Sequence, residues 1–534
     1  MQQPKPTNEN YSKIVERIEE GVFQIPRFQR DFVWDKEKTA QFIDSLLKGF
    51  PIGSFIVWKT KERLKSHREL GKQFIKEPIE GDSIYYVLDG QQRMTSLFLA
   101  LKGMKVGKNN YAEIYIDLDK DIDGDDEICT LTKSENCITF YDLMNSKPSS
   151  LMNKYKTYYE TKIEPLRDHI KRYDFSVIEI ENLPLSKIAE IFTRINTGGK
   201  VLTLFEIMNA KIYTESNGRT QGFDLEERFG VLVKELKYAG YETIEQEPMI
   251  VLQLISLILN RSAKRKSILS IDKKEFITEW SESIESLKKA IELMRSYLKI
   301  PALQILPYSA LLVAFAYFFR LNGSKQHTAN QAQNLSKYFF RSAFGGRFSS
   351  SSDTTLTSDI KLIEKIVSDE SIDFNKEIPM LNEHKDYFIQ TLKDRFVVSN
   401  AFDKAVLCIL AYAEPRSFKN SNKIRLDNSW LRRSDSKNFH HFFPKSYLAK
   451  IKKDEFSNAL ANITFIDSDL NKNIIRAKDP KTYIELFQKE NSNIKEDLKT
   501  HFIDLDDFGI LDNNYDKFLE KRADALADEI LKRI

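Results

Sequence analysis

The chain has 534 residues, with 81 Lys and Arg against 78 Asp and Glu, so its formal net charge is only +3. Hydrophobic residues make up 41% and charged residues 30%, which is typical of a globular protein and excludes an intrinsically disordered chain. The length suggests about three domains. As a whole-chain average, the near-zero charge argues against a nucleic-acid partner.

The cysteines and the apolar segments bear on the cellular compartment. Cys129, Cys137 and Cys408 are an odd number without Cys-x-x-Cys spacing, which disfavours a disulfide scaffold or a zinc ribbon. The first residues are polar, so no secretory signal is expected. The longest apolar run, Ala310–Phe319, is far shorter than the roughly 20 residues of a membrane span. We therefore expect a protein of the reducing cytoplasm with no membrane partner.

Short strands and helices alternate in the first part of the chain. Asp35 is expected to cap a helix that Gly49 and Pro51 end, with an apolar face of Ala40, Ile43, Leu47 and Phe50. Strands are predicted at 54–58, 84–88, 111–118 and 175–180, and helices at 92–102 and 186–196. Thr203 and Glu206 form a Thr-x-x-Glu capping box that opens a further helix.

The remainder of the chain falls into two segments. Residues 216–415 are helical in pattern nearly throughout, and apolar spacing marks helices at 249–259, 276–297, 308–319 and 388–396. Residues 416–437 are polar and basic, which is typical of a linker or a DNA-facing arm. A turn with two histidines, a strand at 462–466, a helix from Ser468 and an amphipathic helix from Tyr515 are expected to follow.

Three polar strings stand out in the first part: Ile25-Pro-Arg-Phe-Gln-Arg30, Val87-Leu-Asp-Gly-Gln-Gln-Arg93 and Phe192-Thr-Arg-Ile-Asn-Thr-Gly-Gly-Lys200. In the second, a strand ends at Asp89-Gly90 and a helix begins near Gln92. Backbone amides at this helix start and the Arg93 guanidinium can bind an anion such as phosphate. A plain strand–turn–helix corner explains the same residues equally well, and the sequence contains no P-loop.

Together these strings resemble the N-terminal domain of the GmrSD-type restriction family, which has a ParB/sulfiredoxin-like fold, over roughly residues 10–215. The resemblance implies NTP binding and hydrolysis by Asp89, Gly90, Gln91, Gln92 and Arg93. It also implies that Arg27, Gln29, Arg30, Asn196 and Lys200 line the same cleft. Sulfiredoxins have a cysteine where this chain has Gln91, so sulfinic-acid reduction is not expected.

The C-terminal segment contains the string His440-His-Phe-Phe-Pro444, followed by Asn462 and Asn471. Hydrolysis of a phosphodiester with one metal ion needs a neutral imidazole as base and a divalent cation at the phosphate. A hairpin with adjacent side chains on opposite faces can supply base and ligand together. A helix packed against that hairpin can bring a second ligand.

This layout resembles the His-Asn-His (HNH) nuclease superfamily, the ββα-metal finger, in its variant with Asn in the third position. The resemblance implies that His441 is the general base and that His440 and Asn471 bind Mg²⁺ or Mn²⁺, with Asn473 a rival to Asn471. Asn462 would buttress the hairpin. The segment also resembles the nuclease half of GmrSD-type proteins, including the helix with Arg522 and Leu526. A buried histidine pair with unrelated asparagines is the alternative explanation.

Charge is unevenly distributed along the chain. Residues 416–481 contain 15 Lys and Arg against 7 Asp and Glu, a net +8, and the rest of the chain sums to −5. A basic stretch around a candidate phosphodiesterase site is the electrostatic signature expected for nucleic acid. The near-neutral total therefore conceals a basic end.

The expected fold is multidomain α+β, with domains at 1–215 (ParB/sulfiredoxin-like sensor), 216–415 (all-α scaffold) and 416–534 (HNH finger with flanking helices). The expected function is a phage-defence DNA endonuclease or nickase, modification-dependent or not, regulated by NTP. Its partners would be DNA, including modified phage DNA, and nucleotide, and an oligomer is compatible with the sequence. One alternative is a nucleotide-dependent ParB-like DNA-binding regulator with a structural finger. Another is an NTPase toxin that acts on RNA.

Overall fold

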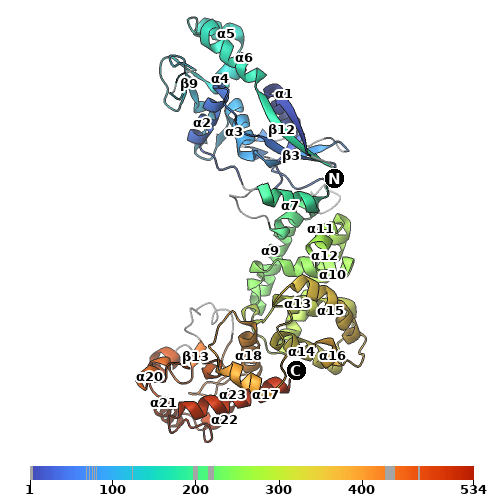
Figure 1. Ribbon diagram of the computed structural model, residues 1–534, viewed down its shortest axis with the longest axis vertical. Coiled ribbons are helices and arrows are strands. Elements are labelled where there is room, and N and C mark those ends of the chain that lie inside the picture. The colour runs from blue at the N-terminus through green and yellow to red at the C-terminus, as the bar shows by residue number, and fades with distance from the viewer. Residues whose placement is uncertain are drawn as a thin grey trace. The chain divides into compact units, whose positions relative to one another are not determined.

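The computed structural model describes residues 4–29, 31–67, 69–70, 73–74, 76, 79, 81–122, 124, 126–195, 203–214, 222–426, 439–466 and 470–534. Residue contacts divide the chain into two compact units, Met1–Leu225 and Glu226–Ile534 (Figure 1). The three domains expected from the sequence stay a prediction.

The first unit is built on a five-stranded mixed sheet with the strand order β1-β12-β3-β6-β2. Its strands are β1 (Lys5–Asn10), β2 (Phe23–Gln24), β3 (Phe55–Thr60), β6 (Ile84–Asp89) and β12 (Asp174–Glu181). β12 runs parallel to β3 and β2 runs parallel to β6, and the other two pairings are antiparallel. This α/β arrangement agrees with the fold class expected for the first part of the chain.

The two faces of the central strands are both buried. Val57 and Val87 lie opposite each other and belong to the main core of the unit. Trp58 and Tyr86 are the next pair, so their side chains point to the other face, where the ring centroids are 5.8 Å apart. β6 is therefore an interior strand with buried side chains on both faces, so the residues at its carboxyl end are held in a fixed place relative to the sheet.

Helices and smaller sheets complete the first unit. The helices are α1 (Tyr11–Glu19), α2 (Lys36–Leu47), α3 (Gln91–Lys102), α4 (Phe140–Asn145), α5 (Pro148–Lys154), α6 (Glu164–Arg172), α7 (Leu185–Ile195) and α8 (Leu204–Ile212). The minor strands are β4 (Glu69–Leu70), β5 (Gln73–Phe74), β7 (Lys105–Val106), β8 (Asn109–Asn110), β9 (Tyr115–Asp117), β10 (Cys129–Thr130) and β11 (Cys137–Thr139). The predicted Asp35 cap of α2 and the Thr203–Glu206 capping box of α8 are confirmed.

The structure differs from the predicted elements in three places. Helix α2 ends at Leu47, so Phe50 lies beyond it and is 55% exposed instead of joining the apolar face. The strand predicted at 111–118 is shorter, because a 3-10 turn at Tyr111–Glu113 precedes β9. The polar strand β1 was not expected, since its sequence lacks apolar alternation, and it forms by antiparallel pairing with β12.

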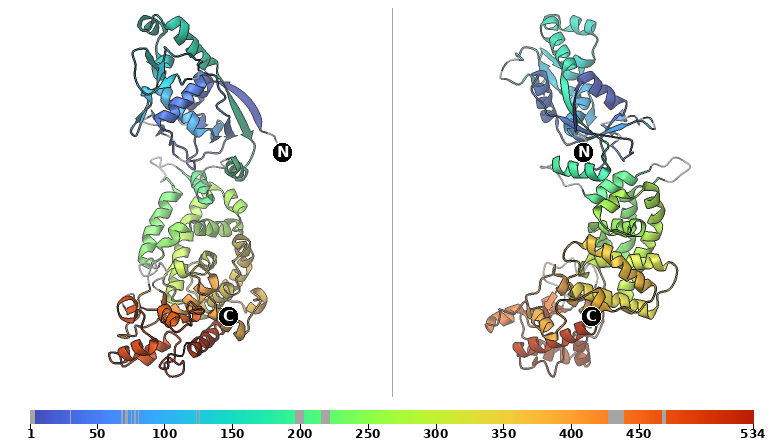
Figure 2. Two further views of the ribbon diagram at one scale, coloured as in Figure 1. Left: turned by 60° about the vertical axis from the view of Figure 1, so that its left-hand side comes forward. Right: turned by 45° about the vertical axis from the view of Figure 1, so that its right-hand side comes forward.

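The second unit begins with a helical array, as the sequence predicted (Figure 2). The helices are α9 (Leu225–Leu236), α10 (Met249–Asn260), α11 (Arg265–Ser270), α12 (Lys273–Ser296), α13 (Ser309–Asn322), α14 (Ala329–Phe344), α15 (Ser352–Val367), α16 (Phe374–Glu377), α17 (Lys385–Lys393) and α18 (Ala401–Tyr412). Helix α13 is almost entirely buried and packs against α10, α12 and α15. Its apolar run is therefore core, and no helix in the described ranges has the length and hydropathy to cross a membrane.

The last part of the second unit contains a small hairpin held by helices. Strands β13 (Phe439–His441) and β14 (Ile463–Phe465) pair antiparallel. The surrounding helices are α20 (Lys445–Lys450), α21 (Pro480–Gln488), α22 (Ile494–Lys499) and α23 (Tyr515–Leu531), and α23 packs against α17. Ser468, where a helix was expected to begin, lies outside the described residues, and Leu470–Ile475 forms a π-helical turn.

Candidate functional site

The junction of β6 and α3 places the Asp-Gly-Gln-Gln-Arg string at the end of an interior strand. Gly90 precedes the helix with φ of +91°, and a Cβ there would lie 2.4 Å from a ring carbon of Phe55. A side chain would be strained by the backbone conformation and would collide with the ring. The tight turn that the sequence predicted at this glycine is confirmed.

Arg93 ties this corner to the segment before β3. Its Nη1 donates to the carbonyl of Ile52 at 2.5 Å, and its Nη2 donates to the carbonyl of Ser54 at 3.0 Å and to Asp89 Oδ2 at 3.0 Å. The guanidinium also lies 5.5 Å from the centroid of the Phe55 ring. Arg93 thus serves as a cross-brace in the described structure, and phosphate binding by it stays a prediction.

Two buried glutamines from the predicted set hold the neighbouring backbone. Gln29 Nε2 donates to the carbonyl of Val87 in β6. Gln92 Oε1 accepts from the Val33 amide at 2.9 Å, and its Nε2 donates to the Asp31 carbonyl at 3.2 Å. The structure therefore brings Gln29, Gln92, Arg93 and Asp89 together around one corner.

Two further predicted residues of the first unit, Arg27 and Gln91, are described. Arg27 is exposed, and its amide donates to the carbonyl of Lys65 at 2.7 Å. Gln91 is buried at the first position of α3. Arg30, Asn196 and Lys200 lie outside the described residues.

In the second unit, Asn462 clamps the loop that follows the two histidines. It is fully buried at the entry to β14. Its Oδ1 accepts from the Phe443 amide at 2.8 Å, and its Nδ2 donates to the carbonyls of Phe443 and Ser457, each at 3.0 Å. The Phe442 amide donates to the Asn462 carbonyl at 2.9 Å. A short polar side chain with both a donor and an acceptor satisfies this loop, and the role of Asn462 in a nuclease site stays a prediction.

The two histidines occupy consecutive positions on β13, so their side chains leave opposite faces of the strand. His440 is only 3% exposed, and its ring lies edge-on to Tyr483 with centroids 6.4 Å apart. His441 is half-buried, and its Nε2 lies 2.8 Å from Asn458 Oδ1. Burial lowers the pKa of His441 to about 4, so the imidazole is neutral near pH 7.

Helices from the end of the chain support the back of this hairpin. Arg522 on α23 is fully buried, and its Nη1 donates to the carbonyl of Ala461 at 2.7 Å. Its Nη2 donates to the carbonyl of His501 at 3.2 Å. Burial lowers the pKa of Arg522 to about 9. The Phe442 ring stacks on Phe518 of α23 at 4.9 Å, so the apolar residues of the histidine string form core.

His501 is a second buried support that sequence reasoning left among scattered single histidines. Its Nδ1 lies 2.7 Å from Thr464 Oγ1 on β14, and its Nε2 lies 2.8 Å from the carbonyl of Arg416. Burial lowers the pKa of His501 to about 3. Asn458 was also missed, because an isolated asparagine in a loop carries no sequence signal of its own.

The candidate metal ligands are only partly described. Within the described residues there is no cluster of three or more His, Cys, Asp or Glu side chains that could hold a metal ion. His440 offers an imidazole, and Asn471 and Asn473 both lie on the π-helical turn at Leu470–Ile475, where their side chains are not described. Imidazole and amide oxygen suit a divalent ion that takes its remaining ligands from phosphate and water. The donor types fit such an ion, and the ligand set stays a prediction.

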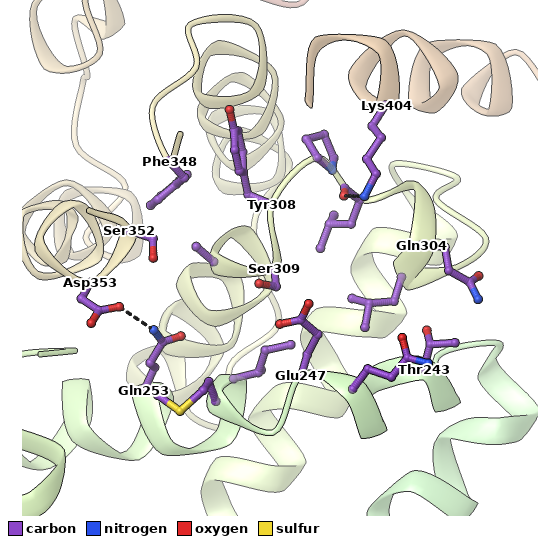
Figure 3. Close-up of a pocket in the computed structure, with 17 residues that line it drawn as sticks. Thr243, Glu247, Gln253, Gln304, Tyr308, Ser309, Phe348, Ser352, Asp353 and Lys404 are labelled. Atoms are coloured by element: carbon purple, nitrogen blue, oxygen red, sulfur yellow. Dashed lines mark hydrogen bonds between the residues drawn. The ribbon is translucent and has the colours of Figure 1, made fainter. Parts of the chain in front are cut away.

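The helical part of the second unit also contains a cavity of about 630 Å³. Figure 3 shows Glu247, Ser309 and Lys404 on its wall, with Gln253 and Asp353 joined by a hydrogen bond of 3.0 Å. Lys404 Nζ donates to the carbonyl of Leu306 at 3.3 Å. The wall carries both carboxylates and an ammonium group, and none of the residues predicted from the sequence lines it.

Comparisons with known proteins extend these observations. Residues 11–213 match the family model for the N-terminal domain of the GmrSD restriction endonuclease, which supports the predicted resemblance over this part of the chain. An uncharacterized protein of Methanocaldococcus jannaschii is 24% identical over 600 aligned positions, which cover 98% of each chain. The similarity to that protein therefore extends through both units.

Proposed function

We propose that this protein is a restriction-related DNA endonuclease or nickase of phage defence, with its phosphodiesterase centre at the β13–β14 hairpin. The match of residues 11–213 to a restriction endonuclease domain supports the defence role and DNA as the partner. The observation that carries the catalytic part is the Asn462 clamp, which holds the loop after His441 through three side-chain hydrogen bonds.

In the proposed reaction, His441 acts as the general base. Its imidazole is neutral near pH 7 and can accept a proton from the attacking water. His440 and Asn471 would hold Mg²⁺ or Mn²⁺, which would stabilise charge on the scissile phosphate and the leaving oxygen. Asn462 keeps the loop, and with it the base, in position on the hairpin.

For the first unit we propose an NTP-binding and NTP-hydrolysing sensor centred on the β6–α3 corner. The Gly90 turn brings the amino end of α3 beside Asp89, and a helix amino end attracts phosphate. Arg93 already donates hydrogen bonds to two backbone carbonyls and to Asp89. A nucleotide phosphate that binds Arg93 would have to replace some of these bonds, and one that binds only the helix amides would leave them in place. Modified phage DNA is a candidate signal for this sensor.

Strand cleavage tests the catalytic proposal directly. Supercoiled plasmid and plain or modified phage DNA are incubated with the full chain, Mg²⁺ or Mn²⁺, and each NTP in turn. We expect wild type to nick or cut and the His441→Ala variant to lose at least about 100-fold in rate. The exposed His169→Asn variant should keep wild-type activity and serves as the control.

The outcomes separate nuclease from regulator. Equal cleavage by wild type and His441→Ala, or no cleavage under any condition, would reject the assigned role of the hairpin. Retention of DNA that depends on nucleotide and survives His441→Ala would instead identify a ParB-like binding protein with a structural finger. Cleavage of RNA but not of DNA in the same assay would instead identify an RNA-directed toxin.

A further inference from the structure

An asparagine outside the predicted HNH residues contacts the His441 ring. Asn458 lies in the segment before Asn462, and its Oδ1 is 2.8 Å from His441 Nε2. The same amide group reaches the strand-like segment after α17, where Nδ2 donates to the carbonyl of Phe396 at 3.0 Å. Asn458 therefore contacts the candidate base with one atom and a fixed backbone position with the other.

The contact to Phe396 settles which way round the amide lies. A backbone carbonyl can only accept a hydrogen bond, so the atom facing Phe396 must be the amide nitrogen. The oxygen then faces His441, and because it only accepts, His441 Nε2 must carry the hydrogen. In a neutral imidazole, the remaining nitrogen, Nδ1, is then the proton acceptor.

The backbone around Asn458 is itself held in place. The Phe396 amide donates to the Asn458 carbonyl at 2.8 Å, and the Leu460 amide donates to the Asp394 carbonyl at 3.0 Å. An isolated antiparallel bridge joins Arg395 and Ala459. Backbone hydrogen bonds thus join the loop after α17 to the segment that enters β14, and Asn458 lies at this junction.

We propose that Asn458 is a positioning residue that holds His441 in the tautomer with hydrogen on Nε2, leaving Nδ1 to take the proton from water. The catalytic meaning of this role rests on the proposed function, but the tautomer is a property of the folded protein and can be measured without any nuclease activity. Asn458 would act through His441 and would not contact the substrate.

Two substitutions distinguish positioning from general support. Asn458→Asp keeps an acceptor for His441 and gives up the donor to the Phe396 carbonyl. Asn458→Leu has a similar size and loses both contacts. The exposed Asn330→Leu on α14, whose amide reaches only Asp369 among the hydrogen bonds described, is a matched control for the same chemical change.

Nitrogen NMR of full-length protein labelled with ¹⁵N-histidine reads the tautomer. The His441 resonances are assigned by their loss in His441→Ala. We expect wild type and Asn458→Asp to show hydrogen on Nε2, whereas Asn458→Leu shows a mixture or the opposite tautomer. Wild type with hydrogen on Nδ1, or an unchanged tautomer in Asn458→Leu, would overturn the proposal.

Cleavage kinetics on the same variants test the consequence. Asn458→Leu should lose about 10- to 100-fold in kcat with little change in KM, because the orientation of the base is lost and substrate contacts remain. Asn458→Asp should recover most of that loss, and Asn330→Leu should match wild type. A loss of equal size in the Asp and Leu variants would assign Asn458 a role in folding only and reject positioning. Wild type that shows the expected tautomer but cuts no DNA would reject the proposed function and leave the assignment of Asn458 standing.

Discussion

Single residues in the second unit combine polar chemistry with deep burial. Asn462, Arg522 and His501 are each at most 1% exposed, yet each makes hydrogen bonds to backbone carbonyls or side chains around β14. A buried polar group without a partner is costly, whereas a bonded one fixes a geometry. These residues therefore indicate that the shape of the hairpin is closely specified.

His501 gives that burial a measurable pH dependence. Burial lowers its pKa to about 3, below the usual value near 6.5, so the unfolded chain binds a proton that the folded chain refuses between these pH values. The stability associated with neutral His501 is complete above pH 6.5 and is lost as the pH falls toward 3. We expect the free energy of unfolding of the second unit to fall steeply over this range.

Urea unfolding followed by circular dichroism across this pH range checks the expectation. His501→Asn should cost about 1–3 kcal/mol at pH 7, since it loses a contact to Thr464 or to the Arg416 carbonyl. It should also flatten the pH dependence. The exposed His169→Asn should retain the wild-type slope, and an unchanged slope in His501→Asn would show that this imidazole does not control acid stability.

At the scale of elements, the β6–α3 corner depends on glycine for two separate reasons. Gly90 has φ of +91°, and a Cβ at this position would lie only 2.4 Å from a ring carbon of Phe55. Gly81 has the same φ of +91°, but a Cβ there would meet no atom of the described residues within 4 Å. The two positions therefore separate backbone strain from steric collision.

We expect Gly90→Ala to lower the free energy of unfolding of the first unit by more than Gly81→Ala does. Placing a residue with a Cβ at this positive φ costs about 1–2 kcal/mol of stability, and the collision with Phe55 adds to that cost. Thermal unfolding of both variants measures the difference. Equal melting temperatures would mean that the Phe55 ring moves aside without cost.

Elements with a strong local signal were predictable from the sequence, and those made by tertiary pairing were not. Interior strands β3 and β6 appear as apolar runs, and α2 and α8 carry visible caps, so their positions were expected within a few residues. Strand β1 has no apolar alternation and depends on β12 for its structure. Helical periodicity likewise overextended the face of α2 to Phe50, because spacing alone does not show where a helix leaves the core.

The candidate site divides in the same way. The motif string and the spacing to Asn462 were visible in the sequence, and the structure shows Asn462, at the entry to β14, bonded to Phe443 in the loop after His441. Asn458 contacts His441 with one atom and the carbonyl of Phe396, after α17, with the other. His501 lies beyond α22 in the chain and contacts Thr464 of β14. Contacts between distant segments leave no periodicity or motif in the sequence.

At the scale of the whole molecule, charge is concentrated where the chemistry is proposed. Residues 416–481 carry a net +8, and the rest of the chain carries −5. Lys419 and Lys423 are exposed on the segment that follows α18. Lys423, whose Nζ bonds Glu414 at 3.0 Å, also lines a surface hollow whose charged residues are Lys237, Arg295, Lys299, Arg425, Glu242 and Glu414. This distribution favours phosphate contacts on the second unit.

Salt dependence of DNA binding measures such contacts. Each phosphate neutralised by a lysine contributes about 0.9 to the slope of log affinity against log salt concentration. If both lysines contact DNA, Lys419→Gln with Lys423→Gln should reduce that slope by about 2, without preference for any sequence. The exposed Lys156→Gln with Lys171→Gln in the first unit changes the net charge equally and should leave the slope unchanged. Equal reductions by both pairs would show that binding follows the charge of the whole molecule, and no reduction by either would place the DNA path elsewhere.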